Sequence, residues 1–294
     1  MRPRPGLTIV ELLVILAIVA TVIALVFPAI QMVRAAAMQM QCNNQMRQIG
    51  LALHHYSSDR GGQLPNVGIN LDDFSFHGTI LPYLEHGSYY QEVMAGTRSF
   101  GSNYVIKQYL CPLDPSPGVA GDVSLHGRCN YAANAQAFLD RPSITHSFKD
   151  GVSSTVALAE RYVYALGTPV VVSDWFHYLP PLYFTQVPGG LVARQATFAH
   201  FPIGTQPYDP LKDDVYPITS GNPPTSVGSI PELTFQVRPR PTEADARIPQ
   251  TGHPSGMPVL MMDGRVVTLR RGVAPEVFWG LVTPRGGEAV ELPD

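Results

Sequence analysis

The chain has 294 residues, enough for one large domain or two small ones, and its formal net charge is −3 at pH 7. Hydrophobic residues make up 45% of the chain, which excludes a disordered chain and a protein embedded in membrane throughout. A nucleic-acid-binding protein of this size typically carries a basic stripe, and the sequence has none. The 26 glycines and 28 prolines favour a loop-rich, β-containing domain over a helical bundle.

The N-terminal region contains one apolar run that is long enough to cross a membrane. In the range Leu12–Ile30 the only polar side chain is Thr21, and these 19 residues would rise about 28 Å as a helix. That length is close to the ~30 Å hydrocarbon core of a bilayer. Arg2 and Arg4 precede the run, and the positive-inside rule leaves them in the cytoplasm. We therefore predict a single-pass inner-membrane anchor over about 9–30, with the rest of the chain periplasmic or at the cell surface.

A cleaved secretory signal peptide is the competing interpretation, because Ala35 and Ala37 form an A-x-A pattern. That pattern lies past Pro28 and Arg34, well beyond the apolar run. Glu11 favours the anchor, because a carboxylate inside an apolar helix is costly and such residues are functional by default. The alternative for this residue is that it only reaches up to the membrane interface.

The segment Gly6–Glu11 reads Gly-Leu-Thr-Ile-Val-Glu and follows a short basic leader. It resembles the signal of type IV prepilins and type II secretion pseudopilins, which a membrane aspartic peptidase cuts after the glycine before the new N-terminus is methylated. The resemblance implies a leader of residues 1–6, cleavage between Gly6 and Leu7, and N-methylation of Leu7. It also implies that Glu11 pairs with the Leu7 amine during assembly, since buried ions need partners. Leucine stands where phenylalanine is commoner in that family, a departure that concerns the cleavage step.

The helix is predicted to continue beyond the membrane, over 7–62. Apolar residues recur at spacings of three and four, which places them on one helix face: Ala35, Met38, Cys42, Met46, Ile49, Leu53 and Tyr56. Gly61-Gly62 and then Pro65 are typical of a helix end. Because Cys42 lies on the packing face, we interpret it as a core residue rather than a reactive thiol.

Further motifs follow in order along the chain: Met40–His54, Ile80–Glu85, Leu110–Pro115, Asn130–Asn134, Lys149–Thr155, and His253 with Asp263-Gly264, which are separated from it by nine residues. Together they resemble the large bacterial prepilin-like family catalogued as domain of unknown function 1559, often described as related to the major pseudopilin. The resemblance implies an α+β, pilin-like fold, in which the long N-terminal helix packs on a mostly antiparallel sheet. The globular domain is then expected over 63–294.

Short apolar runs alternate with turn residues after residue 66, which is the pattern of an antiparallel sheet. An Asp-Gly pair between two apolar runs predicts a hairpin, with both turn residues at positive φ as in a type I′ turn. A proline-rich stretch predicts a long surface excursion. The expected elements are strands at Val156–Glu160 and Pro169–Val172, a hairpin of Pro258–Met262 and Arg265–Leu269 around Asp263-Gly264, a helix at Ala274–Val282, and the excursion at 202–240.

The three cysteines fit no zinc-binding spacing and no C-x-x-C redox pair. Cys111 and Cys129 would close a loop of roughly 19 residues if the domain is exported, and such a bridge adds about 3 kcal/mol by restricting the unfolded chain. A Cys111–Cys129 disulfide is therefore our hypothesis, and two free thiols are the alternative.

Candidate chemistry is sparse. His253 and Asp263 suggest a catalytic or metal pair, but the hairpin explains Asp263 and Gly264 without chemistry, so we favour a structural role for this family motif. No nucleophile, base and orienting residue occur as a set. We expect no enzyme activity, no metal and no cofactor. Calcium is the alternative, since some pseudopilins bind it, although the acidic loops lack EF-hand spacing; the residues concerned are Asp72-Asp73, Asp150 and Asp213-Asp214.

The leading functional hypothesis is a prepilin-like or pseudopilin-like structural subunit of a type II secretion-like or type IV pilus-like system. Its expected partners are the prepilin peptidase/methyltransferase, membrane lipid, and other pilin-like subunits or itself, with no nucleic acid. The alternative is a single-pass, membrane-tethered binding module that does not polymerise and uses the 202–240 excursion. A membrane-anchored hydrolase built on His253 and Asp263 is the third hypothesis.

Overall fold

The structure is a computed structural model, and it describes residues 8–67, 75–98, 104–117, 127–138, 142–165, 171–174, 184–187, 191–199, 234–245 and 248–285. The chain divides into two compact units, Met1–Gln41 and Cys42–Asp294. Each unit is described by itself below.

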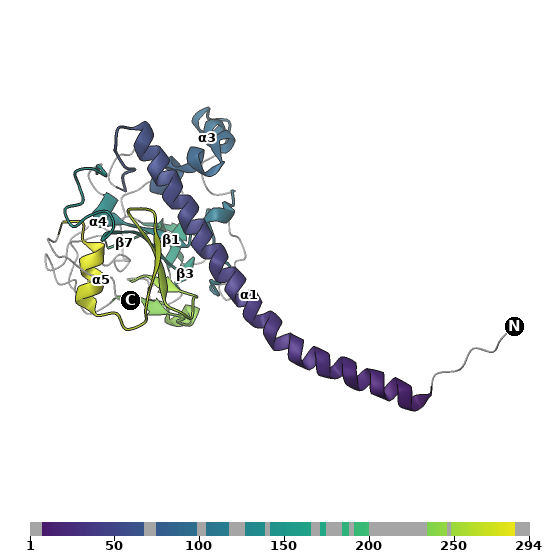
Figure 1. Cartoon of the computed structure of the whole chain (residues 1–294). Helices are drawn as coiled ribbons and strands as arrows, with labels where there is room; N and C mark the ends of the chain where they lie inside the picture. The colour runs from purple at the N-terminus through teal and green to yellow at the C-terminus, as the bar shows by residue number, and fades with distance from the viewer. Residues whose placement is uncertain are drawn as a thin grey trace. The chain divides into compact units, whose positions relative to one another are not determined.

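Helix α1 runs from Ile9 to Asp59 as one continuous element of 51 residues and contributes to both units (Figure 1). It ends at two glycines that adopt positive φ values, 62° at Gly61 and 92° at Gly62. The Gly62 N–H donates to the Ser57 carbonyl at 2.8 Å, which satisfies a carbonyl of the last helical turn. The expected long N-terminal helix and its double-glycine end are confirmed.

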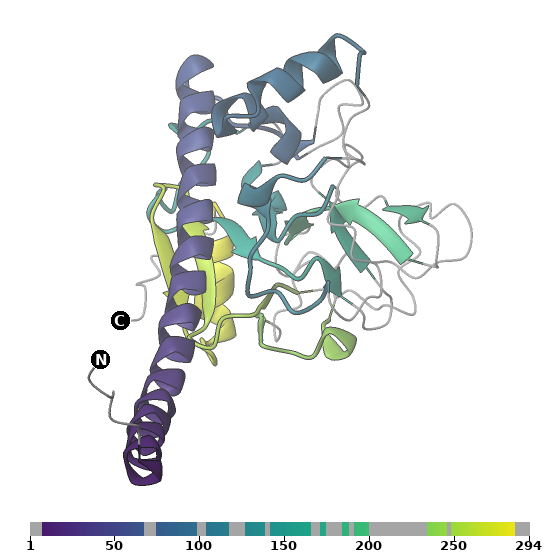
Figure 2. The same cartoon turned by 90° about the vertical axis from the view of Figure 1, so that its right-hand side faces the viewer.

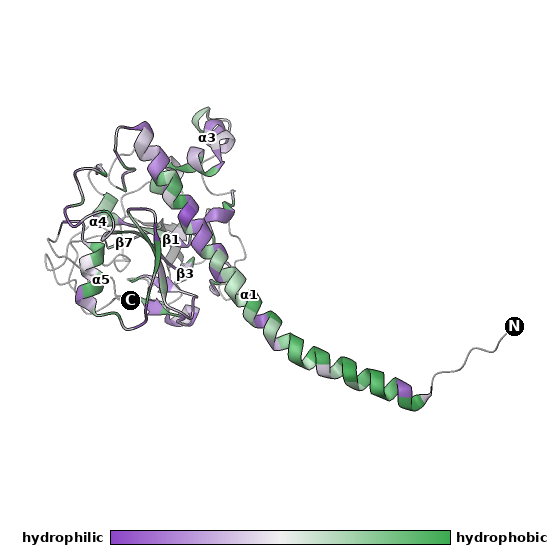
Figure 3. Cartoon of the chain, viewed as in Figure 1, coloured by the Kyte–Doolittle hydropathy of each residue, from purple (hydrophilic) through white to green (hydrophobic). Residues whose placement is uncertain are grey.

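The first unit consists of the apolar part of α1. Every described residue from Thr8 to Ala37 is exposed, and this set includes large aliphatic side chains throughout the stretch Ile9–Val33. In Figure 3 the ribbon of the same stretch is mostly green, the colour of hydrophobic residues. The helix is long and apolar enough to cross a membrane. An aliphatic surface of this extent is stable only against lipid or another apolar partner.

The second unit is built on a sheet of five strands in the order β11-β10-β2-β1-β7. Neighbouring strands are antiparallel, except that β7 pairs parallel to β1. The expected α+β fold with a mostly antiparallel sheet is therefore confirmed. The strands are β1 Tyr131–Asn134, β2 Val156–Glu160, β7 Thr197–Phe198, β10 Met257–Met261 and β11 Val266–Leu269.

The two faces of this sheet are covered by different helices, as the period-2 alternation of a strand requires. Along β10, Val259 and Met261 face a core shared with helix α5 (Pro275–Val282), whereas Leu260 faces a core shared with α1. In Figure 2 the domain part of α1 lies in front of the β10–β11 hairpin and α5 lies behind it. The sheet is thus a middle layer, which explains why its central strands are apolar on both faces.

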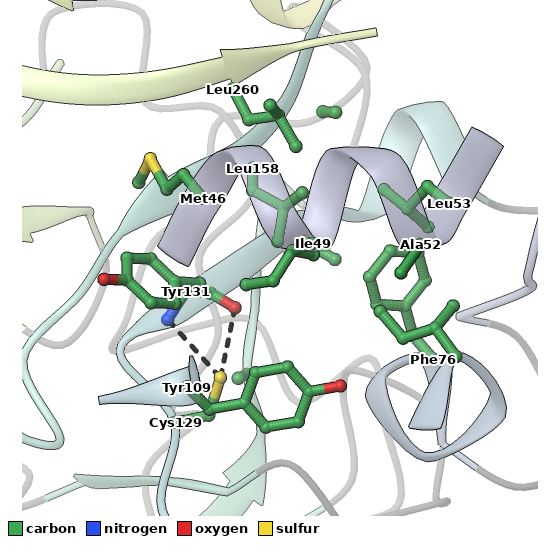
Figure 4. Close-up of a cluster of buried hydrophobic side chains, with 14 of the residues drawn as sticks. Met46, Ile49, Ala52, Leu53, Phe76, Tyr109, Cys129, Tyr131, Leu158 and Leu260 are labelled. Atoms are coloured by element: carbon green, nitrogen blue, oxygen red, sulfur yellow. Dashed lines mark hydrogen bonds between the residues drawn. The ribbon is translucent and has the colours of Figure 1, made fainter. Parts of the chain in front are cut away.

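The α1 side of the core depends on a close approach of helix and strand. Ile49 and Leu53 are buried; in Figure 4 Ile49 lies beside Leu158, and Leu53 lies beside Ala52 and Phe76. A Cβ added to Gly50 would lie 3.0 Å from Leu260 Cδ1, so the absence of a side chain at that position allows the contact. The predicted packing face of the helix is confirmed from Cys42 onward, whereas Ala35 is exposed.

The remaining elements are short. A second sheet has the order β3-β4-β6-β5 and a third pairs β8 with β9. Their strands are β3 Tyr164–Ala165, β4 Val171–Asp174, β5 Phe184–Val187, β6 Leu191–Gln195, β8 Gln236–Val237 and β9 Gln250–Thr251. The helical elements are α2 Phe76–Thr79, η1 Leu81–Leu84, α3 Gly87–Met94, η2 Lys107–Tyr109, α4 Ala135–Phe138 and η3 Pro241–Glu243.

Most of the expected domain elements are present. Strand β2 has the predicted bounds, β4 begins at Val171 where a strand was expected over Pro169–Val172, and α5 occupies the predicted helical segment. The excursion expected over 202–240 lies outside the described residues up to 233.

The hairpin of β10 and β11 is confirmed, but its turn differs from the expected type I′ turn. The Gly264 N–H donates to the Met261 carbonyl at 2.9 Å, and the Met261 N–H donates to the Arg265 carbonyl at 2.8 Å. Gly264 adopts a φ of 88°, whereas Asp263 keeps the negative φ of ordinary L residues. This is a three-residue loop that ends on a left-handed glycine, so only one of the two turn residues needs positive φ.

Burial also fixes the protonation of a histidine in this core. His77 in α2 is fully buried, and its Nε2 lies 2.7 Å from the Tyr131 carbonyl, to which it donates. Burial lowers the pKa of His77 to about 4, against the smaller opposing effect of that hydrogen bond. The folded domain therefore holds a neutral imidazole at this position.

We predict that this histidine makes the domain acid-sensitive between about pH 6.5 and pH 4. An unfolded histidine binds its proton near pH 6.5 and His77 in the folded domain only near pH 4, so unfolding takes up a proton in this window. The free energy of unfolding should fall by about 3 kcal/mol as the pH is lowered through it. Denaturant unfolding of wild type and His77→Gln at a series of pH values measures this. The free energy of unfolding should fall less steeply with decreasing pH in His77→Gln, and the same pH dependence in both proteins would contradict the prediction.

Candidate functional site

The N-terminus of α1 is closed by a reciprocal pair of hydrogen bonds between Thr8 and Glu11. Glu11 Oε2 accepts from the Thr8 N–H at 2.9 Å and from the Thr8 hydroxyl at 2.8 Å. The Glu11 N–H in turn donates to Thr8 Oγ1 at 3.3 Å. The sequence Thr-x-x-Glu thus forms a capping box, which satisfies donors that a helix N-terminus leaves open. Gly6 and Leu7, the predicted cleavage pair, lie outside the described residues.

His253 and Asp263 are not brought together as a pair. Strand β10 runs between them, and five residues of strand span roughly 17 Å. Asp263 instead accepts from the Arg265 backbone N–H at 2.9 Å and pairs with the Arg265 side chain at 2.6 Å. Its contacts are those of a turn residue, whereas His253 lies in a buried cluster with other partners.

The predicted Cys111–Cys129 disulfide is wrong, because Cys111 is bonded to Cys42. The prediction paired the two cysteines that are closest in the sequence, whereas the fold brings Cys42 to Cys111. Cys42 reaches the loop that carries Cys111 from the buried face of α1, with a Cα–Cα distance of 5.2 Å. The Cys129 sulfur points into the core, where it hydrogen-bonds the Tyr131 backbone at 3.3 Å to the carbonyl and 3.4 Å to the N–H (Figure 4). The two cysteines are 69 residues apart in the sequence. By restricting the unfolded chain, the bond stabilises the folded domain by about 4 kcal/mol.

Four side chains from distant parts of the sequence meet at this disulfide. Their ligand-type atoms all lie within 4.8 Å of one another, and all four residues are buried. We call this group the Cys-Cys-His-Glu cluster; its members are Cys42, Cys111, Glu160 and His253. Glu160 is the last residue of β2, and His253 follows β9.

Thr251 holds the two ionisable members of the cluster in place. Its hydroxyl donates to Glu160 Oε2 and accepts from the His253 backbone N–H at 3.0 Å. His253 Nε2 lies 3.4 Å from Glu160 Oε2 and 3.5 Å from Cys111 Sγ. Glu160 and His253 are each 1% exposed as side chains, so a solvent molecule or substrate outside the domain does not reach them.

The electrostatics of the cluster are dominated by burial. Burial raises the pKa of Glu160 to about 8, against the opposing hydrogen bond from Thr251. Burial likewise lowers the pKa of His253 to about 4. Both shifts favour the uncharged forms near neutral pH, so the 3.4 Å contact joins a protonated carboxyl and a neutral imidazole. Within the described residues, Glu160 Oε1 and His253 Nδ1 have no hydrogen-bond partner.

A second group of hydrogen bonds fixes the loop that carries Cys111. Its backbone N–H donates to Asn130 Oδ1 at 2.9 Å, and the Asn130 amide donates to Asp114 Oδ2 at 2.7 Å. The same Asp114 oxygen accepts from the Val163 N–H at 2.8 Å. Burial raises the pKa of Asp114, and these donors oppose the shift. The segments Leu110–Pro115 and Asn130–Asn134, which are separate in the sequence, thus form one support for the cluster.

Gly252 lets the His253 segment approach this loop. A Cβ at residue 252 would lie 2.0 Å from the Leu113 carbonyl oxygen, far inside the closest approach of real atoms. Glycine is therefore required here by backbone packing, and it aligns Thr251 and His253 with the loop of Cys111.

Sequence reasoning identified His253 and Cys111 but missed Glu160, Thr251 and the role of Cys42. The available signal for Glu160 was the apolar run Val-Ala-Leu-Ala that it ends, since a strand buried on both faces can bury its last residue too. Of the acidic residues considered for calcium, Asp150 is half-buried and the others lie outside the described residues. Calcium binding stays a prediction.

Comparison with protein families gives one match. A family model described as protein of unknown function DUF1559 matches residues 31–276, which covers most of the chain and every member of the Cys-Cys-His-Glu cluster. Neither the curated proteins nor the solved structures gave a match. The N-terminal segment up to residue 30 lies outside the matched range.

We predict that Gly252→Ala destabilises the domain by at least about 1–3 kcal/mol, the usual cost of forcing atoms into a packed site. The added methyl meets a backbone carbonyl, which cannot rotate away as a side chain would. Gly87→Ala is the matched control, because a Cβ there meets no atom within 4 Å and alanine favours the helix α3 that begins at this residue. Denaturant unfolding of both variants measures the difference. Equal unfolding midpoints would contradict the predicted clash between the added methyl group and the Leu113 carbonyl.

Proposed function

The chain belongs to the family described as protein of unknown function DUF1559, and we propose that it is a prepilin-like structural subunit, processed at its N-terminus and assembled through α1. The observation that carries this proposal is Glu11. It is the one ionisable side chain in the apolar stretch Ile9–Val33, whose described side chains are exposed.

A carboxylate at the edge of hydrocarbon is expensive unless it has a cationic or hydrogen-bonding partner. Cleavage between Gly6 and Leu7 would create an α-amino group on Leu7, one residue from Thr8. The Thr8 N–H already donates to Glu11, so the new charge would arise beside the carboxylate. In a filament, the same carboxylate could instead pair with the amine of a neighbouring subunit, which would make Glu11 a determinant of assembly.

The Cys42–Cys111 disulfide supports a location of the domain outside the cytoplasm, since disulfides persist mainly in oxidising compartments. Arg2 and Arg4 before the apolar stretch favour a cytoplasmic N-terminus. We therefore propose a single-pass inner-membrane protein whose domain is periplasmic or at the cell surface.

The proposed partners are membrane lipid, a prepilin peptidase/methyltransferase, and further pilin-like subunits or copies of this chain, without nucleic acid. We propose no enzymatic activity and no catalytic cofactor. The burial of Glu160 and His253 supports this, because a catalytic acid or base must reach its substrate.

We predict that the mature protein begins at Leu7 and carries one additional methyl group on its α-amine. The mass of the N-terminal peptide of protein purified from membranes measures this directly. A peptide that begins at Met1 would contradict processing and favour the membrane-tethered binding module. One that begins at Met38 would contradict the anchor altogether.

We also predict that Glu11→Gln impairs assembly although the helix cap survives. Glutamine can replace glutamate in a capping box but cannot pair with a charged amine. Thr8→Val is the matched control, because it removes the hydroxyl of the cap and leaves the Glu11 charge. The yield of sheared filaments, or of subunits cross-linked in membranes, compares the variants at equal protein levels. Normal assembly of Glu11→Gln, or equal defects in both variants, would contradict a role for the charge.

A further inference from the structure

We propose that the Cys-Cys-His-Glu cluster is a structural zinc site in the thiol form of the protein, and that zinc and the disulfide are alternative occupants of the same position. Its ligands would be two thiolates, one imidazole nitrogen and one carboxylate oxygen, from Cys42, Cys111, His253 and Glu160.

The spacing of the cluster fits one tetrahedral ion. Zinc binds sulfur at ~2.3 Å and nitrogen or oxygen at ~2.0–2.2 Å, so neighbouring ligand atoms of a tetrahedral site lie about 3.3–3.8 Å apart. His253 Nε2 lies 3.4 Å from Glu160 Oε2 and 3.5 Å from Cys111 Sγ. Once the disulfide is reduced, the two sulfurs separate to non-bonded distance, and the other pairs of ligand atoms in the cluster lie within 4.8 Å of one another.

The donor set selects the class of ion. Thiolate and imidazole ligands favour zinc over calcium or magnesium, which take oxygen ligands. Four protein ligands fill a tetrahedral zinc ion and leave no open position, as in structural rather than catalytic sites. The site would therefore stabilise the fold without adding an activity.

Two further observations point to a ligand. Glu160 is buried, yet its Oε1 has no hydrogen-bond partner within the described residues, and an unpaired buried carboxyl oxygen is costly. Thr251 donates to Glu160 Oε2, the oxygen that lies 3.4 Å from His253 Nε2, and accepts from the His253 N–H, so one side chain orients two ligands. Outer hydrogen bonds of this kind are usual around zinc ligands.

Protons and electrons balance in the exchange between the two states. Two thiols and the protonated Glu160 carboxyl bind one zinc ion and release three protons, which leaves two thiolates and a carboxylate as ligands. A two-electron oxidant of the azo class then takes two electrons from the thiolates and two protons from water. The sulfur–sulfur bond forms, zinc leaves, and the carboxylate takes back one proton. A phosphine reverses the oxidation, because it cleaves the disulfide, becomes a phosphine oxide with oxygen from water, and leaves two thiols.

The test uses the full-length chain, produced in a reducing cytoplasm and kept in detergent with a phosphine under anaerobic conditions. Alkylation and mass measurement verify that Cys42 and Cys111 are thiols. Titration with Co²⁺ should give one ion per chain, with the visible bands of tetrahedral cobalt and thiolate-to-cobalt charge-transfer absorption, and Zn²⁺ should displace it. Absence of tetrahedral, thiolate-bound cobalt in this verified thiol form would overturn the proposal.

Variants assign the ligands. Thr251→Val should lower cobalt affinity by about 10- to 100-fold through the lost outer hydrogen bond, and Glu160→Gln by at least as much. Cys129→Ser is the matched control, because this buried thiol lies outside the cluster, and it should leave the spectrum unchanged.

Oxidation to the Cys42–Cys111 disulfide should release the ion. Loss of the spectrum in Cys129→Ser, or equal cobalt binding by the oxidised chain, would also overturn the assignment. Circular dichroism shows whether each variant is folded, and the wild-type titration decides the matter if a variant is not.

Discussion

The domain depends on the burial of one face of α1 from Cys42 to Ser57. This face covers the five-stranded sheet, and Gly50 lets it approach strand β10. Its one long polar member, Gln45, is satisfied on both sides, since it donates to the Lys107 carbonyl and accepts from the Tyr131 hydroxyl. From Ile9 to Ala37 the same helix is exposed all round. One continuous helix therefore has two kinds of surface, an apolar part long enough to cross a membrane and a part that packs one face on a protein core.

The second constraint is the cost of buried polar groups. Strand β2 ends with a glutamate that is completely buried, beside an arginine that is 1% exposed. Arg161 donates to the Thr197 carbonyl, and Glu160 accepts from Thr251, so each is held by a hydrogen bond rather than by solvent. Apolar side chains would fill this space at lower cost, but they would not fix the direction of the loops. The polar cluster ties α1, the Cys111 loop, β2 and the His253 segment to one relative arrangement.

The sequence predicted those parts of the fold whose signals are local. Periodicity located α1, an apolar run located β2, and Asp-Gly marked the hairpin, because each depends on residues a few positions apart. The disulfide depended on contact between residues 42 and 111, which chain spacing does not report. Reading Cys42 as a core residue was correct in burial, and that same burial concealed its bond. Glu160 was missed because a charged residue after an apolar run usually marks a strand end in solvent.

Family membership and the proposed assembly role rest on different parts of the molecule. The matched range 31–276 contains the disulfide and the buried cluster, whereas Glu11 and the predicted cleavage pair lie before it. Family membership therefore describes the globular domain, and it neither supports nor opposes cleavage between Gly6 and Leu7. Assembly is proposed because a single carboxylate, Glu11, lies in an apolar helix, where its charge is costly. If the carboxylate stays ionised, its charge has two ways to be stabilised, a cation beside it or withdrawal to the membrane interface. The capping box with Thr8 is compatible with both, because it satisfies hydrogen bonds without neutralising the charge. A charge-removing substitution that keeps the cap separates the two solutions, since only the paired carboxylate contributes energy to a contact between subunits.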